Sequence, residues 1–129
     1  MDSRQVVIVE DDAPVRDSLE TLLALEGYEV QGFASAESFL ESYSPDLGRC
    51  LLVDIRMPGM DGLQLLDQMA VRKIAMQVIV MTGHGDVPVA VRAMKAGAVD
   101  FLEKPFDFEQ LLNALRTAFD RLHQRSNGL

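Results

Sequence analysis

Four short apolar runs are the most regular feature of the hydrophobic pattern of this chain, and each stops abruptly at polar residues. The runs are rich in Val, Ile and Leu without strict alternation, which is typical of strands that are covered on both faces. They lie at residues 6–9, 50–53, 78–81 and 99–102. Another strand is predicted at residues 28–33. The pattern therefore predicts five strands.

The segments between the predicted strands carry apolar residues at helical spacing. We predict five amphipathic helices from this spacing, and Gly27 and Gly97 close the first and the fourth. Their apolar stripes are Val15, Leu19, Leu22 and Leu23; Ala36, Phe39, Leu40 and Tyr43; Leu63, Leu66 and Ala70; Val87, Ala90, Val91 and Met94; and Phe108, Leu111, Leu112, Leu115, Phe119 and Leu122. Strands that alternate with helices over short connections predict a parallel sheet with right-handed crossovers. The predicted fold is α/β, a flavodoxin-like doubly wound (βα)5 fold with strand order 2-1-3-4-5.

The composition fits one domain and sets its charge. The chain has 129 residues, of which 48% are hydrophobic, and its formal net charge is -8. An acidic surface repels phosphate backbones, so we expect no nucleic-acid binding by this domain alone. The single Cys50 excludes an internal disulfide and suits a reducing cytoplasm, and no apolar stretch is long enough for a membrane span. We therefore expect a cytoplasmic protein that does not bind membranes.

The folded part is predicted to end where the sequence turns polar. Residues 1–122 form the predicted domain, and residues 123–129 form a polar tail or the start of a linker. The sequence leaves two cases open: a regulator truncated before its next domain, or a domain that acts alone.

Acidic, hydroxyl and ammonium groups follow four of the predicted strands. They are Glu10, Asp11, Asp54, Thr82 and Lys104. The carboxyl ends of parallel strands meet at one edge of the sheet, where open α/β folds bind ligands. A carboxylate such as that of Asp54 can attack phosphorus if positive charge offsets the charge of the transferring group. Three carboxylates favour Mg²⁺ as one source of that charge, with Lys104 as the other.

Asp12 belongs to the same acidic run but is interpreted differently. It precedes Ala13 and Pro14, an arrangement typical of a helix N-cap followed by proline in the first turn. We therefore leave Asp12 out of the predicted metal site.

The positions of these groups match a known family. The matching motifs are Glu10-Asp11 after the first strand, Asp54 after the third, Thr82 after the fourth and Lys104-Pro105 after the fifth. Together they resemble the receiver domain of two-component response regulators, and the resemblance extends from residue 6 to about residue 122. Within that family, the stretches TGHGDVP at 82–88 and AMKAGAVDF at 93–101 are similar to FixJ and its relatives.

The resemblance implies a phosphoryl-transfer role for the residues at this edge of the sheet. Asp54 corresponds to the phosphoacceptor, and Lys104, before a proline bonded in cis, corresponds to the cation that binds the phosphoryl group. Glu10 stands where the family commonly has Asp. The implied ligands of Mg²⁺ are Glu10, Asp11, Asp54 and the backbone carbonyl of Arg56.

Four positions are implied to respond to the phosphoryl group. Thr82 and Phe101 correspond to a switch pair, in which Thr82 moves onto the phosphoryl group and Phe101 turns into the space that it leaves. Arg56 and His84 match positions that set the lifetime of the acyl phosphate in the family. We hypothesise that these two residues tune it in this chain.

The resemblance also implies how such a domain signals. A sensor histidine kinase would phosphorylate Asp54, and the phosphorylated domain would form a homodimer through the fourth helix and the fifth strand, residues 87–101. The dimer would control an effector, a DNA-binding transcription regulator that is absent from these residues. The chain would then be a signalling phosphoacceptor and not an enzyme, because only its own phosphorylation and dephosphorylation are expected.

Three other functions share some of these features. A small Mg²⁺-dependent phosphohydrolase of the haloacid dehalogenase type also uses an aspartate nucleophile, but it needs a second Asp where this chain has Arg56, and a longer chain for its cap. A receiver-like interaction module that is never phosphorylated is expected to lose one of the key positions, and none is lost. A flavodoxin-like FMN carrier shares the fold, but the acids after the first strand would repel the phosphate.

Overall fold

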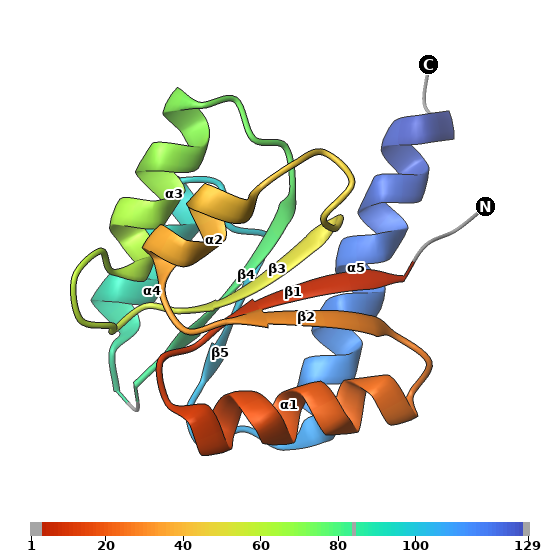
Figure 1. Cartoon of the computed structure of the whole chain (residues 1–129), viewed down its shortest axis with the longest axis horizontal. Helices are drawn as coiled ribbons and strands as arrows, with labels where there is room; N and C mark the ends of the chain where they lie inside the picture. Colours follow the sequence, from red (N-terminus) through yellow and green to blue (C-terminus); the bar gives the residue numbers. More distant parts are fainter. Residues whose placement is uncertain (1–3, 84, 128–129) are drawn as a thin grey trace.

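Five parallel strands form one sheet in the order β2-β1-β3-β4-β5 in a computed structural model that describes residues 4–83 and 85–127. The strands alternate with helices along the chain (Figure 1). The elements are β1 (Gln5–Val9), α1 (Ala13–Leu25), β2 (Glu29–Phe33), α2 (Ala36–Ser42), β3 (Cys50–Asp54), α3 (Gly62–Val71), β4 (Gln77–Thr82), α4 (Val87–Lys95), β5 (Asp100–Glu103) and α5 (Phe108–Asn127). The predicted flavodoxin-like fold and strand order are confirmed.

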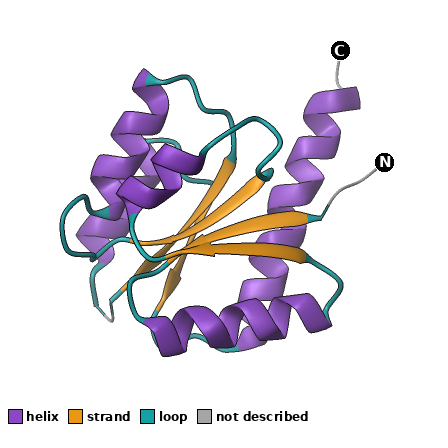
Figure 2. Ribbon diagram, in the orientation of Figure 1, coloured by secondary structure: helices purple, strands orange, loops and turns teal. Residues whose placement is uncertain are grey.

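The sheet separates two hydrophobic layers because successive side chains of a strand point to opposite faces. On one face, β1 contributes Val7 and Val9, which pack with residues of α2, α3 and α4. On the other face, Val6 and Ile8 pack with residues of α1 and α5. Helices therefore cover both faces of the sheet (Figure 2), as its apolar strands predict.

Side-chain caps fix the beginnings of the first two helices. The carboxylate of Asp12 accepts a hydrogen bond of 3.2 Å from the Val15 N–H, and Pro14 lies in the first turn of α1. The hydroxyl of Ser35 accepts one of 3.0 Å from the Ser38 N–H at the start of α2. Each cap satisfies an amide that has no partner within its helix. The interpretation of Asp12 as an N-cap is confirmed.

The strand residue Cys50 is buried between the layers, as a small apolar side chain would be. Burial raises the pKa of its thiol to about 12, so the thiolate form is disfavoured. Among the described residues, no helix is both long enough and apolar enough to cross a membrane.

Helix α3 buries a different set of side chains against the sheet from the set that the sequence predicts. Leu66 is buried as predicted, whereas Leu63 is only partly buried and Ala70 is exposed. Leu65 and Met69 are buried instead. The prediction was wrong here because apolar residues occur all round this helix, so spacing alone does not select the inner face.

Helix α4 also turns a different stripe towards the sheet. Ala90 is buried as predicted, together with Ala93, but Val87, Val91 and Met94 are 55%, 45% and 40% exposed. The helix contacts β4 and the edge strand β5, and the small side chains of the two buried alanines leave room for this contact. The larger apolar side chains are left on its outer face.

Helices α1 and α5 differ from the sequence predictions in one respect each. In α1, Leu19 and Leu23 are buried as predicted, but Leu22 is 41% exposed. Helix α5 continues to Asn127, beyond the predicted domain boundary at residue 122. The division into residues 1–122 and a tail at 123–129 stays a prediction.

Candidate functional site

The Lys104 ammonium lies between two buried carboxylates at the carboxyl edge of the sheet. Its Nζ atom is 2.9 Å from Oε1 of Glu10 and 3.0 Å from Oδ2 of Asp54. Glu10 follows β1, Asp54 ends β3 and Lys104 follows β5, so the parallel sheet brings together residues far apart in the sequence. The Lys104–Pro105 peptide bond is cis, as the resemblance implies.

The charges of this cluster depend on one another. Burial raises the pKa of Glu10, and the nearby charge of Asp54 raises it further, although the hydrogen bond from Lys104 acts in the opposite direction. Burial alone would lower the pKa of Lys104, but its hydrogen bonds to Glu10 and Asp54 outweigh this, and the pKa lies above its ordinary value. The lysine is therefore held as a cation beside two acids.

An acidic cluster at the same edge has the donors that a hard cation requires. Carboxylate oxygens of Glu10, Asp11 and Asp54 all lie within 4.8 Å of one another. Glu10 and Asp54 are buried and Asp11 is exposed, so the cluster opens to solvent on one side. Oxygen ligands with room for water suit Mg²⁺. The residues present therefore fit the predicted ion.

The loop after β3 holds Asp54 through its own backbone. The Arg56 N–H donates a hydrogen bond of 3.1 Å to Oδ1 of Asp54. Further along, the Met60 N–H donates one of 2.9 Å to Oε2 of Glu37 on α2. That bond lowers the pKa of the Glu37 carboxyl group. Sequence reasoning missed Glu37, because no local pattern marks a contact between α2 and a loop.

The predicted switch residues occupy neighbouring strands. Thr82 is buried at the end of β4, and its hydroxyl donates a long hydrogen bond of 3.5 Å to the Leu102 carbonyl. A bond of this length holds the hydroxyl weakly. Phe101 on β5 is 38% exposed at the surface beside α4. The structure thus places Thr82 near the site and Phe101 on the outside, and their switch role stays a prediction.

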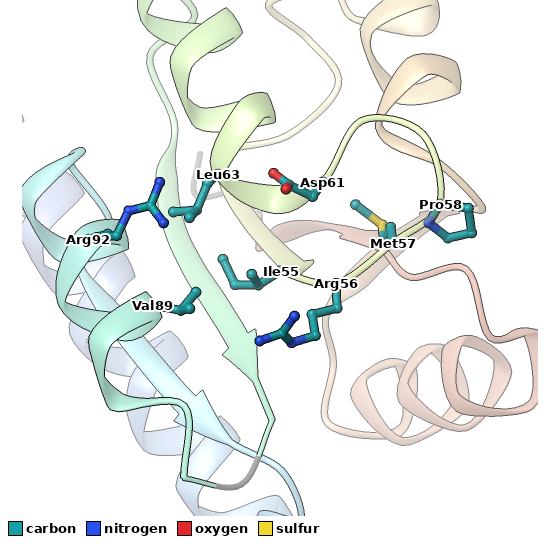
Figure 3. A pocket seen from close by; sticks show the side chains of 8 residues that line it. All are labelled: Ile55, Arg56, Met57, Pro58, Asp61, Leu63, Val89 and Arg92. Carbon is teal, nitrogen blue, oxygen red and sulfur yellow. The ribbon is translucent and has the colours of Figure 1, made fainter.

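The side chain of Arg56 reaches across to the start of α4. Its Nη2 atom lies 2.7 Å from Oδ2 of Asp86. A cleft of ≈ 460 Å³ lies here between the β3–α3 loop and α4 (Figure 3). It is lined by Ile55, Arg56, Met57, Pro58, Asp61, Leu63, Val89 and Arg92. The predicted tuning residue Arg56 therefore contacts the N-cap residue of α4, while its partner in that prediction, His84, lies outside the described residues.

A second contact holds the β4–α4 loop from the other side. The Gly85 N–H donates a hydrogen bond to the carboxylate of Glu103, the residue before Lys104. Sequence reasoning missed both Asp86 and Glu103. Asp86, before Val87 and Pro88, has the sequence of an ordinary N-cap, and nothing local marks its long-range partner.

Comparison with known proteins identifies the family. Residues 6–116 match the response regulator receiver domain. The chain belongs to this family. It is 48% identical over 120 residues to the transcriptional regulatory protein FixJ of Azorhizobium caulinodans, and 47% identical over 120 residues to nodulation protein W of Bradyrhizobium diazoefficiens. The predicted resemblance is confirmed.

Solved structures agree with this assignment. The crystal structure of FixJ-N has a TM-score of 0.85 and 48% sequence identity, covering 92% of this chain and 94% of that one. The two curated relatives are longer: the matches cover 93% of this receiver domain but only 57% of FixJ and 53% of nodulation protein W. The receiver domain thus spans about half the length of the curated relatives it matches.

Proposed function

We propose that Asp54 accepts a phosphoryl group from the phosphohistidine of a sensor histidine kinase. The observation that carries the proposal is the placement of the Lys104 ammonium within hydrogen-bond distance of both Asp54 and Glu10, beside an acidic cluster that suits Mg²⁺. Phosphoryl transfer depends on positioning and on charge neutralisation, and this edge of the sheet supplies both.

Asp54 is the nucleophile in the proposed transfer step. An oxygen of the Asp54 carboxylate attacks the phosphorus of the phosphohistidine, and a P–O bond forms as the P–N bond breaks. The bonding electron pair returns to the imidazole nitrogen of the kinase, which takes up a proton from solvent. Glu10, Asp11, Asp54 and the Arg56 carbonyl would hold Mg²⁺, which would supply positive charge to the phosphoryl oxygens. Lys104 binds another of these oxygens, and the Thr82 hydroxyl donates to a third.

The output surface proposed for this domain is the α4–β5 face. It carries four exposed apolar side chains. They are Val87, Val91, Met94 and Phe101. When Thr82 moves onto the phosphoryl group and Phe101 turns inward, the shape of this face changes. A second phosphorylated copy then docks on it, and the homodimer controls an effector.

The effector is proposed to be a DNA-binding domain elsewhere in a longer cytoplasmic protein. A similar relative is named a transcriptional regulatory protein, and the receiver domain covers 57% of it. We further propose that the domain is a phosphoacceptor and not an enzyme of small-molecule turnover. The residue two positions after Asp54 is Arg56, whose guanidinium pairs with Asp86, so no general acid stands where a haloacid dehalogenase hydrolase requires one.

The proposal is tested by intact-mass measurement after incubation with acetyl phosphate, with and without Mg²⁺. We expect one phosphate adduct on the wild type that depends on the metal. The Asp54→Asn variant should show none, and Asp46→Asn, at an exposed aspartate after α2, is the control that should behave as wild type. No adduct on the wild type would support the interaction module, and continuous phosphate release would support the hydrolase.

A further inference from the structure

Asp86 stands at the N-cap position of α4 but does not cap the helix. The equivalent residues of α1 and α3 do so, because Asp12 and Asp61 accept hydrogen bonds from the third amide of their helices, at 3.2 Å and 2.8 Å. The side chain of Asp86 makes no capping hydrogen bond. Its carboxylate is instead 2.7 Å from the guanidinium of Arg56 and is 17% exposed. An ion pair thus competes with a helix cap for one carboxylate.

Only one amide in the first turn of α4 could receive this cap. An N-cap side chain bonds to the second or third N–H of its helix. The second residue of α4 is Pro88, which has no N–H. The third is Val89, which lines the same cleft as Arg56 (Figure 3). The Val89 N–H is therefore a specific reporter of whether Asp86 caps the helix.

Arg56 is placed to respond to a charge on Asp54. Its backbone N–H already donates to Oδ1 of Asp54, whereas its side chain is 71% exposed and can move in solvent. A phosphoryl group carries more negative charge than a carboxylate, and a guanidinium binds its oxygens through two parallel hydrogen bonds. A phosphoryl group on Asp54 would thus compete with Asp86 for the same cation.

We propose that Asp86 is a positioning residue that exchanges partners when Asp54 is phosphorylated. Its carboxylate binds Arg56 in the unphosphorylated domain. The phosphoryl group then draws Arg56 away, and Asp86 caps the Val89 N–H at the start of α4. The inference rests on the proposed function, because phosphorylation of Asp54 is what moves Arg56. It connects the phosphorylation site to the helix that carries the output surface.

The change of bonding partner by Asp86 can be tested without phosphorylation, by measuring amide hydrogen exchange with NMR. Arg56→Ala should release Asp86, and exchange at the Val89 N–H should become about five- to tenfold slower, as a single N-cap stabilises a helix end. Arg56→Lys keeps a cation and should restore fast exchange at Val89. The Gln64 N–H, which Asp61 caps in α3, is the internal reference and should not change.

Two further variants separate this mechanism from a general effect on structure. Arg92→Ala removes another arginine that lines the cleft and should leave exchange at Val89 unchanged. The double variant Arg56→Ala/Asp86→Ala should lose the protection, because no carboxylate remains to cap the helix. Unchanged Val89 exchange in Arg56→Ala, or protection that persists in the double variant, would overturn the inference.

A second experiment measures hydrogen exchange at the Val89 N–H after phosphorylation. Acetyl phosphate and Mg²⁺ should slow exchange at Val89 in the wild type but not in Asp86→Ala, with the phosphate adduct followed by mass in the same samples. An absent adduct counts against the proposed function alone, because the Arg56→Ala measurement needs no phosphate. An adduct with equal Val89 protection in the wild type and Asp86→Ala would overturn the role of Asp86.

Discussion

The ammonium of Lys104 lies 3.0 Å from Oδ2 of Asp54 and donates a hydrogen bond to it. Asp54 ends β3 and Lys104 follows β5, and these two strands are separated in the sheet by β4. The backbone N–H of Lys104 donates to the Thr82 carbonyl at 2.8 Å, so the same residue contacts the strand that lies between them. We therefore expect a change of charge at Asp54 to act on Lys104 directly, and through Lys104 on the end of β4.

Replacement of Lys104 by alanine should separate phosphorylation from its output. Lys104→Ala should still accept phosphate from acetyl phosphate, but slowly, because the acidic cluster proposed to bind Mg²⁺ remains. Dimerisation should be lost, because the cation that couples the phosphoryl group to Thr82 and Phe101 is missing. Intact mass and analytical ultracentrifugation measure the two steps. Arg121→Ala, which removes an exposed cation from α5, should phosphorylate and dimerise normally.

A Lys104→Ala domain that dimerised as well as the wild type at equal phosphate occupancy would contradict the coupling. Loss of phosphorylation alone, with normal dimerisation of the fraction that is phosphorylated, would make Lys104 a residue of the transfer step and not of the switch.

The stability of the metal-free domain should depend on pH through Glu10. Because its folded pKa is raised above the ordinary value of 4.5, Glu10 contributes stability below about pH 4.5 and loses it as the pH rises through the folded pKa. The amide of Glu10→Gln does not titrate, so this variant should not lose stability in that way. In a chelator, the Tm of Glu10→Gln should therefore increase relative to the wild type as the pH rises from 4.5 towards neutrality.

Addition of Mg²⁺ at neutral pH should raise the Tm of the wild type relative to that of Glu10→Gln, which is the opposite of the change expected in a chelator. If Glu10, Asp11 and Asp54 bind the ion as proposed, it should stabilise the folded wild type, and it should stabilise Glu10→Gln less because that variant has one ligand fewer. Thermal unfolding with and without Mg²⁺ measures both effects. A Tm difference that does not change with pH in the chelator would contradict the raised pKa of Glu10.

Gly62 is expected to be the glycine most sensitive to a methyl group near the site. A Cβ atom there would lie 2.8 Å from the Asp54 carbonyl oxygen and 2.8 Å from Cα of Ile55. Backbone atoms cannot rotate away, so α3 would have to move from the loop. Gly62→Ala should lower the free energy of unfolding by about 1–3 kcal/mol, a typical cost of overpacking. Gly83→Ala, which would meet no atom within 4 Å, is the control and should unfold like the wild type in denaturant.

The sequence predicted the fold and the centre of the site because both follow from local signals. Buried strands end at polar residues, and a parallel sheet must bring those ends together. This logic placed Glu10, Asp54 and Lys104 in one cluster, and their contacts in the structure agree with it. The caps at Asp12 and Ser35 were likewise predicted from side-chain type and spacing.

The parts that were missed depend on packing between distant segments. The inner face of α4 was misassigned because spacing cannot show that two alanines, Ala90 and Ala93, fit best against the edge of the sheet. The ion pair of Arg56 with Asp86 joins two loops, and an Asp before a helix carries the same sequence signal whether it caps or not. Which face of a helix is buried, and which partner a carboxylate binds, depends on tertiary contacts that cannot be read from one sequence.

The exposed apolar side chains of α4 are expected to lie in the interface of the phosphorylated dimer. Val91 is 45% exposed near the centre of the α4–β5 face, so an arginine at this position has room in the monomer but would be buried without a partner in a dimer. Val91→Arg should phosphorylate normally and should weaken dimerisation of the phosphorylated domain by about tenfold or more, equivalent to about 1.4 kcal/mol. Leu25→Arg is the matched control, because Leu25 is 78% exposed on α1, which covers the opposite face of the sheet. Sedimentation equilibrium at matched phosphate occupancy measures the effect. If Leu25→Arg weakened the dimer and Val91→Arg did not, the dimer interface would lie at α1, and the exposed valines and methionine of α4 would need another partner.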